Sequence, residues 1–282
     1  MTATDGTLVT IDGRDTLRFE RRFRQPIERV WRAITAPEEM RAWFPSDVVG
    51  ERAVGAELLF EDEAQRDAAR AEGEPTRDDG PIFHGRVVAY DPPQVFSFTW
   101  GGELLRFELR PEGDGTLLVF TQVLSHPAVA ARNGAGWHAC LDALGVALDG
   151  PDRDADEPDW RRTYDRYVTA IGPPLGRPDG NGAVTWEGST HVDAERVRAA
   201  TGDPDAMATW GARERAGDPL RWDVEPTEHG TVFRLTHAAI GSDAELAATW
   251  HALLIQLDMQ LASGTLVPVD PKTWVDEYRD IL

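Results

Sequence analysis

Residues 28–43, ERVWRAITAPEEMRAW, recur as residues 195–210, ERVRAATGDPDAMATW, at a spacing of 195 − 28 = 167. A second stretch, residues 105–121 (LRFELRPEGDGTLLVFT), recurs as residues 220–236 (LRWDVEPTEHGTVFRLT) at a spacing of 220 − 105 = 115. Because the spacing falls from 167 to 115, the second copy lacks 167 − 115 = 52 residues between the two blocks. The matched blocks predict a duplicated domain whose second copy is shortened.

The end of each copy also matches. Trp137-His138-Ala139 recurs as Trp250-His251-Ala252, and Trp160 with Tyr164 recurs as Trp274 with Tyr278. We therefore expect a first domain at residues 1–171, a linker at 172–182 (GPPLGRPDGNG) and a shortened repeat at 183–282.

The first copy reads as a strand, two short helices, a run of antiparallel strands and a long helix. Pro26 and Pro37 open the two helices, since proline is tolerated in a first helical turn. Turn sequences at 91–93, 101–102 and 112–115 separate alternating apolar segments. The predicted strands are residues 17–24, 56–60, 82–90, 94–100, 104–110 and 116–123, and the long helix covers 127–148.

Residues 61–80, EDEAQRDAARAEGEPTRDDG, are charged and lack large apolar groups, which predicts a mobile insertion. In the long helix Trp137, Leu141, Leu144 and Leu148 form one stripe, so this helix is expected to lie across the apolar face of the sheet.

Composition excludes several classes of protein. The net charge of −20 disfavours nucleic acid and anionic lipid headgroups as partners. Cys140 is the only cysteine, which excludes an internal disulfide and a cysteine-based zinc cluster. The chain starts without a signal-peptide pattern and contains no run of about 18 apolar residues, so we expect a cytoplasmic protein without membrane insertion.

The stretches PIERVWRAITAPEEMRAWF, VGAELLFE, GRVVAYDPPQVFSFTW and GWHACLDALGVAL resemble one family in particular. It is the family named after the activator of the ninety-kilodalton heat-shock protein ATPase, within the START-like (SRPBCC) superfamily. The resemblance covers about residues 17–149. It implies an α+β helix-grip fold, in which an antiparallel sheet wraps around a long C-terminal helix. In relatives, the cavity between sheet and helix binds hydrophobic small molecules, or the domain contacts a chaperone. The resemblance implies no fixed catalytic set.

The second copy keeps one strand (183–191), the helix pair (193–210), two strands (220–225 and 231–237) and the long helix (243–261). An incomplete sheet leaves edges and one apolar face in need of cover. The missing strands are those that would enclose a cavity, so we expect the pocket in residues 17–149 and none of comparable volume wholly within 183–282.

Large apolar side chains concentrated on the strands and helices of the first copy are the candidates to line that cavity. A packed core is the alternative for any single one of them. His84 is added as a polar group, although an exposed strand histidine is the more common arrangement. The ligand-binding candidates are Trp31, Trp43, Phe44, Phe83, His84, Phe96, Phe98, Trp100, Phe107, Trp137 and Leu141.

No catalytic or metal-binding set stands out. His138 lies four residues before Asp142, a spacing at which a carboxylate can orient an imidazole, but the second copy has His251 with Ile255 there. Ser125-His126 is adjacent in sequence without a nucleophile-elbow motif. The histidines lack metal-binding spacings and the glycine-rich nucleotide motifs are absent, so no cofactor, metal or catalytic residue is expected.

Three functions remain open. The first is a non-catalytic protein that binds a hydrophobic small molecule in its first domain. The second is an enzyme resembling polyketide cyclases or aromatases, in which the cavity orients a reactive chain. The third is a chaperone-interacting module. A homodimer is compatible with each.

Overall fold

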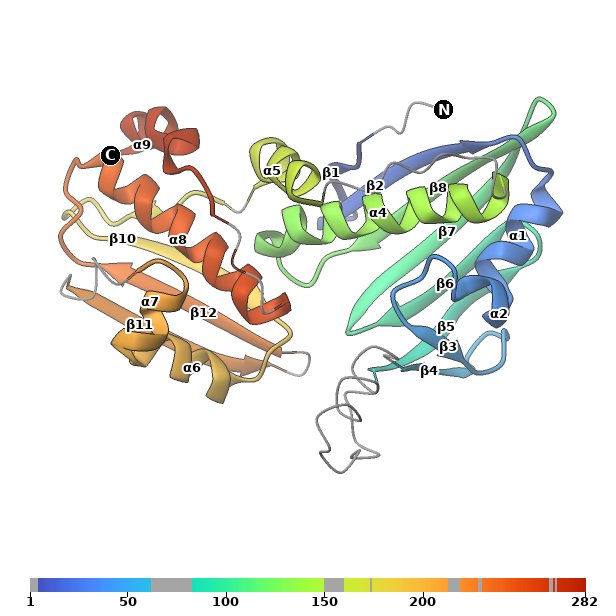
Figure 1. Ribbon diagram of the computed structural model, residues 1–282, viewed down its shortest axis with the longest axis horizontal. Coiled ribbons are helices and arrows are strands. Elements are labelled where there is room, and N and C mark those ends of the chain that lie inside the picture. Colours follow the sequence, from blue (N-terminus) through green and yellow to red (C-terminus); the bar gives the residue numbers. More distant parts are fainter. Residues whose placement is uncertain are drawn as a thin grey trace. The chain divides into compact units, whose positions relative to one another are not determined.

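A computed structural model describes residues 5–61, 83–149, 160–172, 174–212, 219–227, 230–263, 266 and 268–282. The chain forms two compact units, one comprising residues 1–125 and 134–160 and the other residues 126–133 and 161–282. Each unit contains its own antiparallel sheet and its own long helix (Figure 1).

The first unit begins with two strands and two short helices, followed by a meander and the long helix. Its elements are β1 (Thr7–Ile11), β2 (Arg14–Phe23), α1 (Ile27–Thr35), α2 (Pro37–Met40), β3 (Asp47–Val49), β4 (Glu57–Glu61), β5 (Phe83–Asp91), β6 (Val95–Trp100), β7 (Glu103–Glu112), β8 (Gly115–Val123), and α4 (Ala130–Asp149), most of which lies in this unit. The strands form one sheet in the order β1-β2-β8-β7-β6-β5-β4-β3. This is the α+β helix-grip architecture expected from the sequence.

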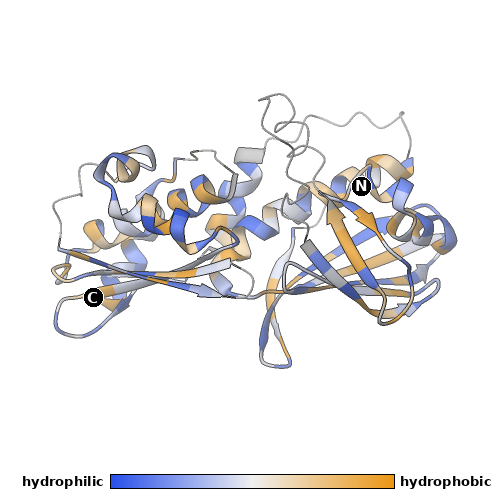
Figure 2. Cartoon of the chain, turned by 90° about the horizontal axis from the view of Figure 1, so that it is seen from below, coloured by the Kyte–Doolittle hydropathy of each residue, from blue (hydrophilic) through white to orange (hydrophobic). Residues whose placement is uncertain are grey.

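Local chemistry explains the meander. Trp100 pairs with Glu103 across a two-residue turn, and the intervening Gly101 and Gly102 have φ of 55° and 83°. Glycine adopts this left-handed conformation without the steric penalty of other residues, so the predicted turn closes the hairpin there. On the strand after it, Leu105, Phe107 and Leu109 are buried and alternate with half-buried residues. Figure 2 shows apolar and polar positions side by side along the strands of each sheet.

Two strands of the first unit are absent from the sequence-based prediction. β1 pairs with β2, from Thr7 opposite Arg18 to Ile11 opposite Arg14, and β3 pairs with β4. Both are short and largely half-buried or exposed, so they carry little of the hydrophobic pattern on which such predictions depend. The predicted insertion at 61–80 lies, apart from Glu61, outside the described residues.

The second unit is smaller. Its elements are η1 (Pro127–Val129, a 3-10 helix), α5 (Trp160–Ile171), β9 (Arg177–Pro178), β10 (Val184–Thr190), α6 (Ala194–Gly202), α7 (Pro204–Thr209), β11 (Leu220–Thr227), β12 (Gly230–His237), α8 (Ala244–Ser263), η3 (Pro271–Trp274, also 3-10) and α9 (Val275–Ile281). The sheet has the order β11-β12-β10-β9. The segment expected to be a linker thus contributes β9 to this sheet, and residues 161–171 group with the second unit.

The two sheets share a register. In the first, Phe19 on β2 lies opposite Phe120 on β8, and in the second, Trp186 on β10 lies opposite Leu235 on β12. These partners are related by 186 − 19 = 167 and 235 − 120 = 115, the spacings found in the sequence. A one-residue difference in either pairing would turn every side chain of a strand to the other face.

The helix pairs also correspond in detail. The indole Nε1 of Trp43 donates a hydrogen bond to the carbonyl oxygen of Ala33 at 2.9 Å. The indole of Trp210 donates in the same way to Ala200 at 3.4 Å, again with both partners displaced by 167 residues. Each bond holds the end of a second short helix against the first.

The second unit has a core of its own. Phe233 and Leu235 are at most 1% exposed, and Trp250 on α8 is fully buried. Trp222 and Val224 on β11 are half-buried. On the apolar face that was expected to need cover, Phe233 and Leu235 are therefore buried.

Candidate functional site

Nine rings of the first unit form a continuous aromatic cluster between the sheet and the helices. Phe44 lies at its centre, with ring centroids 5.7 Å from Trp137 and 6.0 Å from Phe98. The shortest separation is 4.6 Å, between Phe120 and Trp137. We define the aromatic cluster as Trp43, Phe44, Phe60, Phe96, Phe98, Trp100, Phe107, Phe120 and Trp137.

The cluster is buried except at one end. Eight of its rings are at most 5% exposed, whereas Trp100, at the end of β6, is half-buried. The Trp100 ring is 5.6 Å from Phe44 and 5.8 Å from Trp137. The buried aromatic surface therefore reaches the molecular surface at Trp100, and also at the half-buried Tyr90, whose ring lies 6.0 Å from Phe96.

The predicted site residues fall into four groups, of which His84 alone forms the last. Trp43, Phe44, Phe96, Phe98, Trp100, Phe107 and Trp137 meet in the cluster, and Leu141 is fully buried on α4 beside it. Trp31 is half-buried, and its ring lies 5.4 Å from Tyr90. The side chain of Phe83 lies outside the described part of the chain.

His84 does not join the cluster, which corrects its inclusion among the pocket residues. Its side chain is 63% exposed, and Nδ1 lies 3.2 Å from a carboxylate oxygen of Glu57. His84 therefore lies on the solvent-facing side of β5.

Two cluster members were missed in the sequence. Phe120 lies in the alternating pattern of the predicted strand at 116–123, so that signal was available. Phe60 ends a predicted strand just before the charged insertion, where the pattern breaks off.

A buried polar network adjoins the cluster and also escaped prediction. The Trp137 indole donates a hydrogen bond to Gln122 Oε1 at 2.8 Å, and the Gln122 amide donates to Glu103. The carboxylate of Glu103 further accepts bonds from the amide and hydroxyl of Ser125, both at 2.9 Å. Glu103 is 8% exposed and Gln122 is fully buried. The network satisfies these buried polar groups and fixes the orientation of Trp137.

The predicted pairing of His138 with Asp142 is present in a cluster of charged groups. His138 Nε2 lies 3.3 Å from Asp142, and its Nδ1 lies 3.5 Å from Asp5. The other oxygen of Asp142 lies 3.6 Å from Arg21 Nε, and the Arg21 side chain is 1% exposed. Asp142 thus lies within ion-pair distance of a buried guanidinium as well as of the imidazole, which favours a structural role for this carboxylate.

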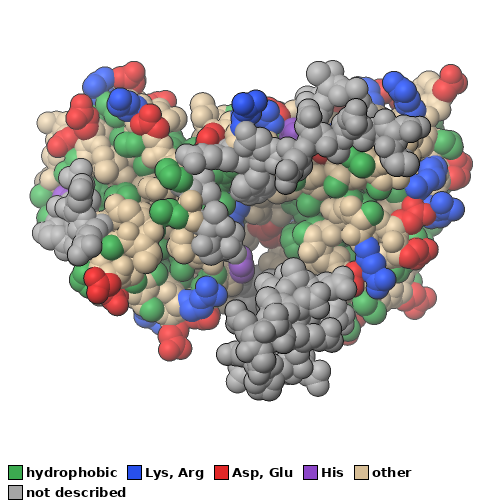
Figure 3. All heavy atoms as spheres, viewed as in Figure 1, with side chains coloured by type: hydrophobic (Ala, Val, Ile, Leu, Met, Phe, Trp, Pro, Cys, Tyr) green, Lys and Arg blue, Asp and Glu red, His purple; other side chains and the backbone are tan. Residues whose placement is uncertain are grey.

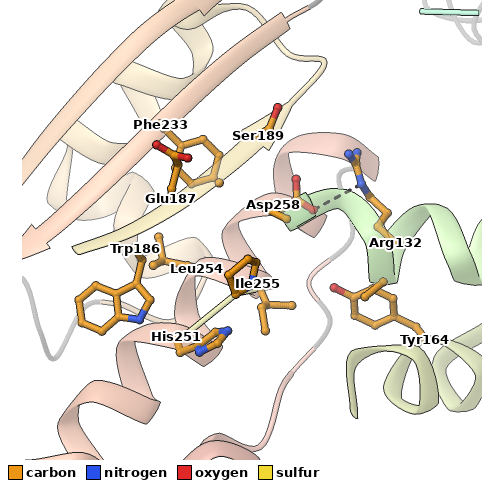
Figure 4. Close-up of a pocket in the computed structure, with 14 residues that line it drawn as sticks. Arg132, Tyr164, Trp186, Glu187, Ser189, Phe233, His251, Leu254, Ile255 and Asp258 are labelled. Carbon is orange, nitrogen blue, oxygen red and sulfur yellow. Dashed lines mark ion pairs between the residues drawn. The ribbon is translucent and has the colours of Figure 1, made fainter. Parts of the chain in front are cut away.

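A cavity lies in the second unit. The volume of the cavity is about 30 Å³. It is about 470 Å³ when all the empty space out to the open mouth is included. Figure 4 shows Trp186 and His251 on one side, and Arg132 and Tyr164 on the other. The cavity is lined by Ala128, Ala131, Arg132, Tyr164, Pro174, Trp186, Glu187, Gly188, Ser189, Phe233, His251, Leu254, Ile255 and Asp258. Since several of these precede residue 183, it is not formed by residues 183–282 alone.

Polar groups around this cavity are largely buried. Arg132 Nε lies 3.4 Å from Asp258 Oδ2, and the two side chains are 17% and 14% exposed. Burial raises the pKa of Asp258 and that of Tyr164, because desolvation disfavours their charged forms. The Tyr278 hydroxyl accepts hydrogen bonds from the Trp186 indole at 2.6 Å and from the Gly176 amide at 2.7 Å, and lies 3.0 Å from His251 Nδ1.

The remaining candidate groups are possible metal ligands and the thiol of Cys140. In the described part of the chain, no three His, Cys, Asp or Glu side chains are placed to hold a metal ion. Burial raises the pKa of Cys140 to about 12, so its nucleophilic thiolate is scarcely populated at neutral pH. None of the described helices combines the length and apolar character needed to cross a membrane. On the face seen in Figure 3, acidic and basic side chains are interspersed.

The first unit defines a class of protein, an α+β helix-grip domain of the START-like type. Its residues 24–149 match the model of the family described as activator of Hsp90 ATPase homolog 1-like protein. This segment belongs to that family. No curated protein matches the chain.

Several solved structures resemble part of the chain. CalU16 from Micromonospora echinospora is 21% identical, with 61% of this chain and 96% of that chain covered and a TM-score of 0.46. A Bordetella parapertussis protein is 26% identical, with coverage of 61% and 96% and a TM-score of 0.43. The Aha1 dimer from Colwellia psychrerythraea is 18% identical, with coverage of 49% and 98% and a TM-score of 0.39.

Proposed function

We propose that this chain binds a hydrophobic small molecule at the aromatic cluster of its first unit and does not catalyse a reaction on it. The START-like family supports the general class of small-molecule binding or cyclase-like proteins. The observation that carries the specific proposal is the continuity of the cluster with the surface at Trp100. The Trp100 ring contacts Phe44, Phe60 and Trp137, so an apolar ligand held against Trp100 would extend the buried aromatic packing.

The chemistry around this end of the cluster supports binding over catalysis. Glu103 is the buried carboxylate that the hydrogen-bond network joins to Trp137 through Gln122. Both of its oxygens already accept hydrogen bonds. A general base needs a lone pair directed at the substrate proton. Such a ligand would therefore be held mainly by aromatic and apolar contacts, with no large electrostatic contribution.

The second unit is proposed to be a shortened copy of the first, with the repeat at residues 183–282 preceded by a connecting segment. The shared strand register and the paired Trp43 and Trp210 bonds support this duplication. Three of its four strands, β10, β11 and β12, correspond to β2, β7 and β8, and no strand in the described part of the second unit corresponds to β3–β6. We also propose a cytoplasmic location, because the chain has a single cysteine and so lacks the internal disulfides common in secreted domains.

Native mass spectrometry of the chain purified from its own host tests the proposal directly. A co-purifying apolar molecule is expected. Binding of the fluorescent apolar probe 1-anilinonaphthalene-8-sulfonate should then weaken severalfold in Trp100→Ala but not in Trp31→Ala. Trp31 is the matched control, since it is also a half-buried tryptophan but, among the described residues, touches no cluster ring directly and is joined to Phe96 only through Tyr90. Equal binding by both variants would contradict the proposed location.

A polyketide cyclase or aromatase-like enzyme is the second candidate, favoured by the burial of Glu103 beside the cluster. It predicts that the co-purifying molecule is converted on incubation and that Glu103→Gln stops the conversion. A chaperone recovered with the chain in place of a small molecule would favour the third function, an interaction module.

A further inference from the structure

The cavity of the second unit forms where the two copies differ in chemistry. At the spacing of 167, Gly188 on β10 stands where the first copy has Arg21 on β2. At the spacing of 251 − 138 = 113, Ile255 on α8 stands where the first copy has Asp142. The first unit thus has an ion pair between strand and helix at this place, with the Arg21 side chain 1% exposed and that of Asp142 36% exposed, whereas the second unit has a glycine and an apolar side chain there.

Glycine at position 188 is required by the neighbouring strand. A Cβ atom at Gly188 would lie 2.4 Å from Cζ of Phe233, so the Phe233 ring occupies the space directly above the strand backbone. This ring, with Leu254 and Ile255 on α8, gives the cavity an apolar wall (Figure 4). The cavity volume of about 30 Å³ has room for about two water molecules, and the open mouth allows a larger molecule to extend outward.

One end of the cavity is polar and its hydrogen bonding is incomplete. Arg132 and Asp258 form an ion pair at 3.4 Å, but Arg132 Nε and Asp258 Oδ1 make no hydrogen bond within the described residues. Buried polar atoms are normally hydrogen-bonded, since an unmade bond leaves the cost of desolvation uncompensated. A bound group that both accepts from Arg132 Nε and donates to Asp258 Oδ1 would complete the site.

Charge and geometry select that group. The positive charge of the guanidinium and the negative charge of the carboxylate cancel. An anion would be repelled by Asp258, and a cation would be repelled by Arg132. A hydroxyl is neutral, and its single oxygen both accepts and donates a hydrogen bond. Beyond the function proposed for the first unit, we propose that this cavity binds a small, neutral, mostly apolar molecule through one hydroxyl group held by Arg132 and Asp258.

Phenol is a suitable probe, with benzene and benzoate as matched controls for the hydroxyl and for charge. Ligand-observed NMR on the full chain should give tighter binding for phenol than for benzene, by about two- to tenfold for one satisfied hydroxyl. Benzoate should bind more weakly than phenol. Benzoate binding as tight as phenol would overturn the assignment of a neutral ligand, and no detectable phenol binding would overturn the site.

The double variant Arg132→Met with Asp258→Leu removes both charges together, so neither is left buried without its partner. It should lose the preference for phenol over benzene while still binding benzene. Asp258→Asn keeps the size of the side chain and should weaken phenol binding alone, which gives a second readout if the double variant misfolds. Unchanged phenol binding in both variants would refute the role of the pair.

Trp100→Ala separates this site from the one proposed in the first unit. Phenol binding should be unaffected by that change. If phenol binding is instead lost in Trp100→Ala and kept in both cavity variants, the second-unit site is refuted and the first-unit proposal stands.

Discussion

Replacement of Trp137 by alanine should strongly destabilise the first unit. The side chain is 3% exposed, and its ring contacts Phe44, Trp100 and Phe120. Removing a large buried aromatic side chain costs about 3–5 kcal/mol. The change also takes away the donor that satisfies Gln122 Oε1 at 2.8 Å, and a buried acceptor left without a partner costs a further ~1–3 kcal/mol. The sum is comparable with the whole stability of many domains.

Trp137→Phe divides this loss into its two parts. Phenylalanine keeps an aromatic ring in the cluster but cannot donate to Gln122, so we expect a loss of about 1–3 kcal/mol, mainly from the hydrogen bond. Urea unfolding followed by far-UV circular dichroism gives the free energies. Because the chain has two units, hydrogen exchange measured by mass spectrometry is needed to assign each transition to its unit.

The burial argument would be wrong if Trp137→Ala lowered the stability by less than about 1 kcal/mol, the scale of an exposed substitution. It would also be wrong if the faster exchange appeared in residues 161–282 and not in β7 and β8. A small loss of stability together with weaker binding of an apolar probe would instead place Trp137 at an open pocket.

Three further outcomes follow from the second unit. Tyr278→Phe leaves the donors of Trp186 and Gly176 without their acceptor, and should cost about 2–4 kcal/mol, seen as faster exchange in β10; unchanged exchange there would contradict the hydrogen bonding. Burial raises the pKa of Asp258, so between its unfolded-state and folded-state pKa values the folded state binds more protons than the unfolded state. The contribution of Asp258 to stability is therefore greatest at acid pH and is lost as the pH rises between these two values. Thermal melts over a pH series should show this slope in the native chain and not in Asp258→Asn, and identical slopes would exclude Asp258 as its source. Residues 183–282 expressed alone lack Gly176 and Arg132, and are expected to be partly unfolded or to aggregate, whereas a soluble monomer with a cooperative melt near that of the full chain would show that the repeat is self-sufficient.

The two sites differ in how far the sequence could reveal them. Seven of the eleven predicted ligand-binding residues meet in the aromatic cluster because strand and helix periodicity fix which side chains share a face. The prediction for His84 is wrong because periodicity alone does not say which face of a short strand is buried. Glu103 is a different case, since its three hydrogen-bond donors come from Gln122 and Ser125, which lie about twenty residues later in the chain.

The sequence by itself determined the order of elements, the helix-grip fold of the first unit and the spacings that relate the two halves. These follow from local patterns of apolar residues, prolines and glycines, which are properties of neighbouring positions. Only the tertiary structure decided that the segment expected to be a linker joins the second sheet and that a cavity lies beside Gly188. That cavity depends on whether the Phe233 ring, the α8 side chains and the ion pair of Arg132 with Asp258 fill the available volume, and close packing is a property of side chains brought together from distant parts of the chain.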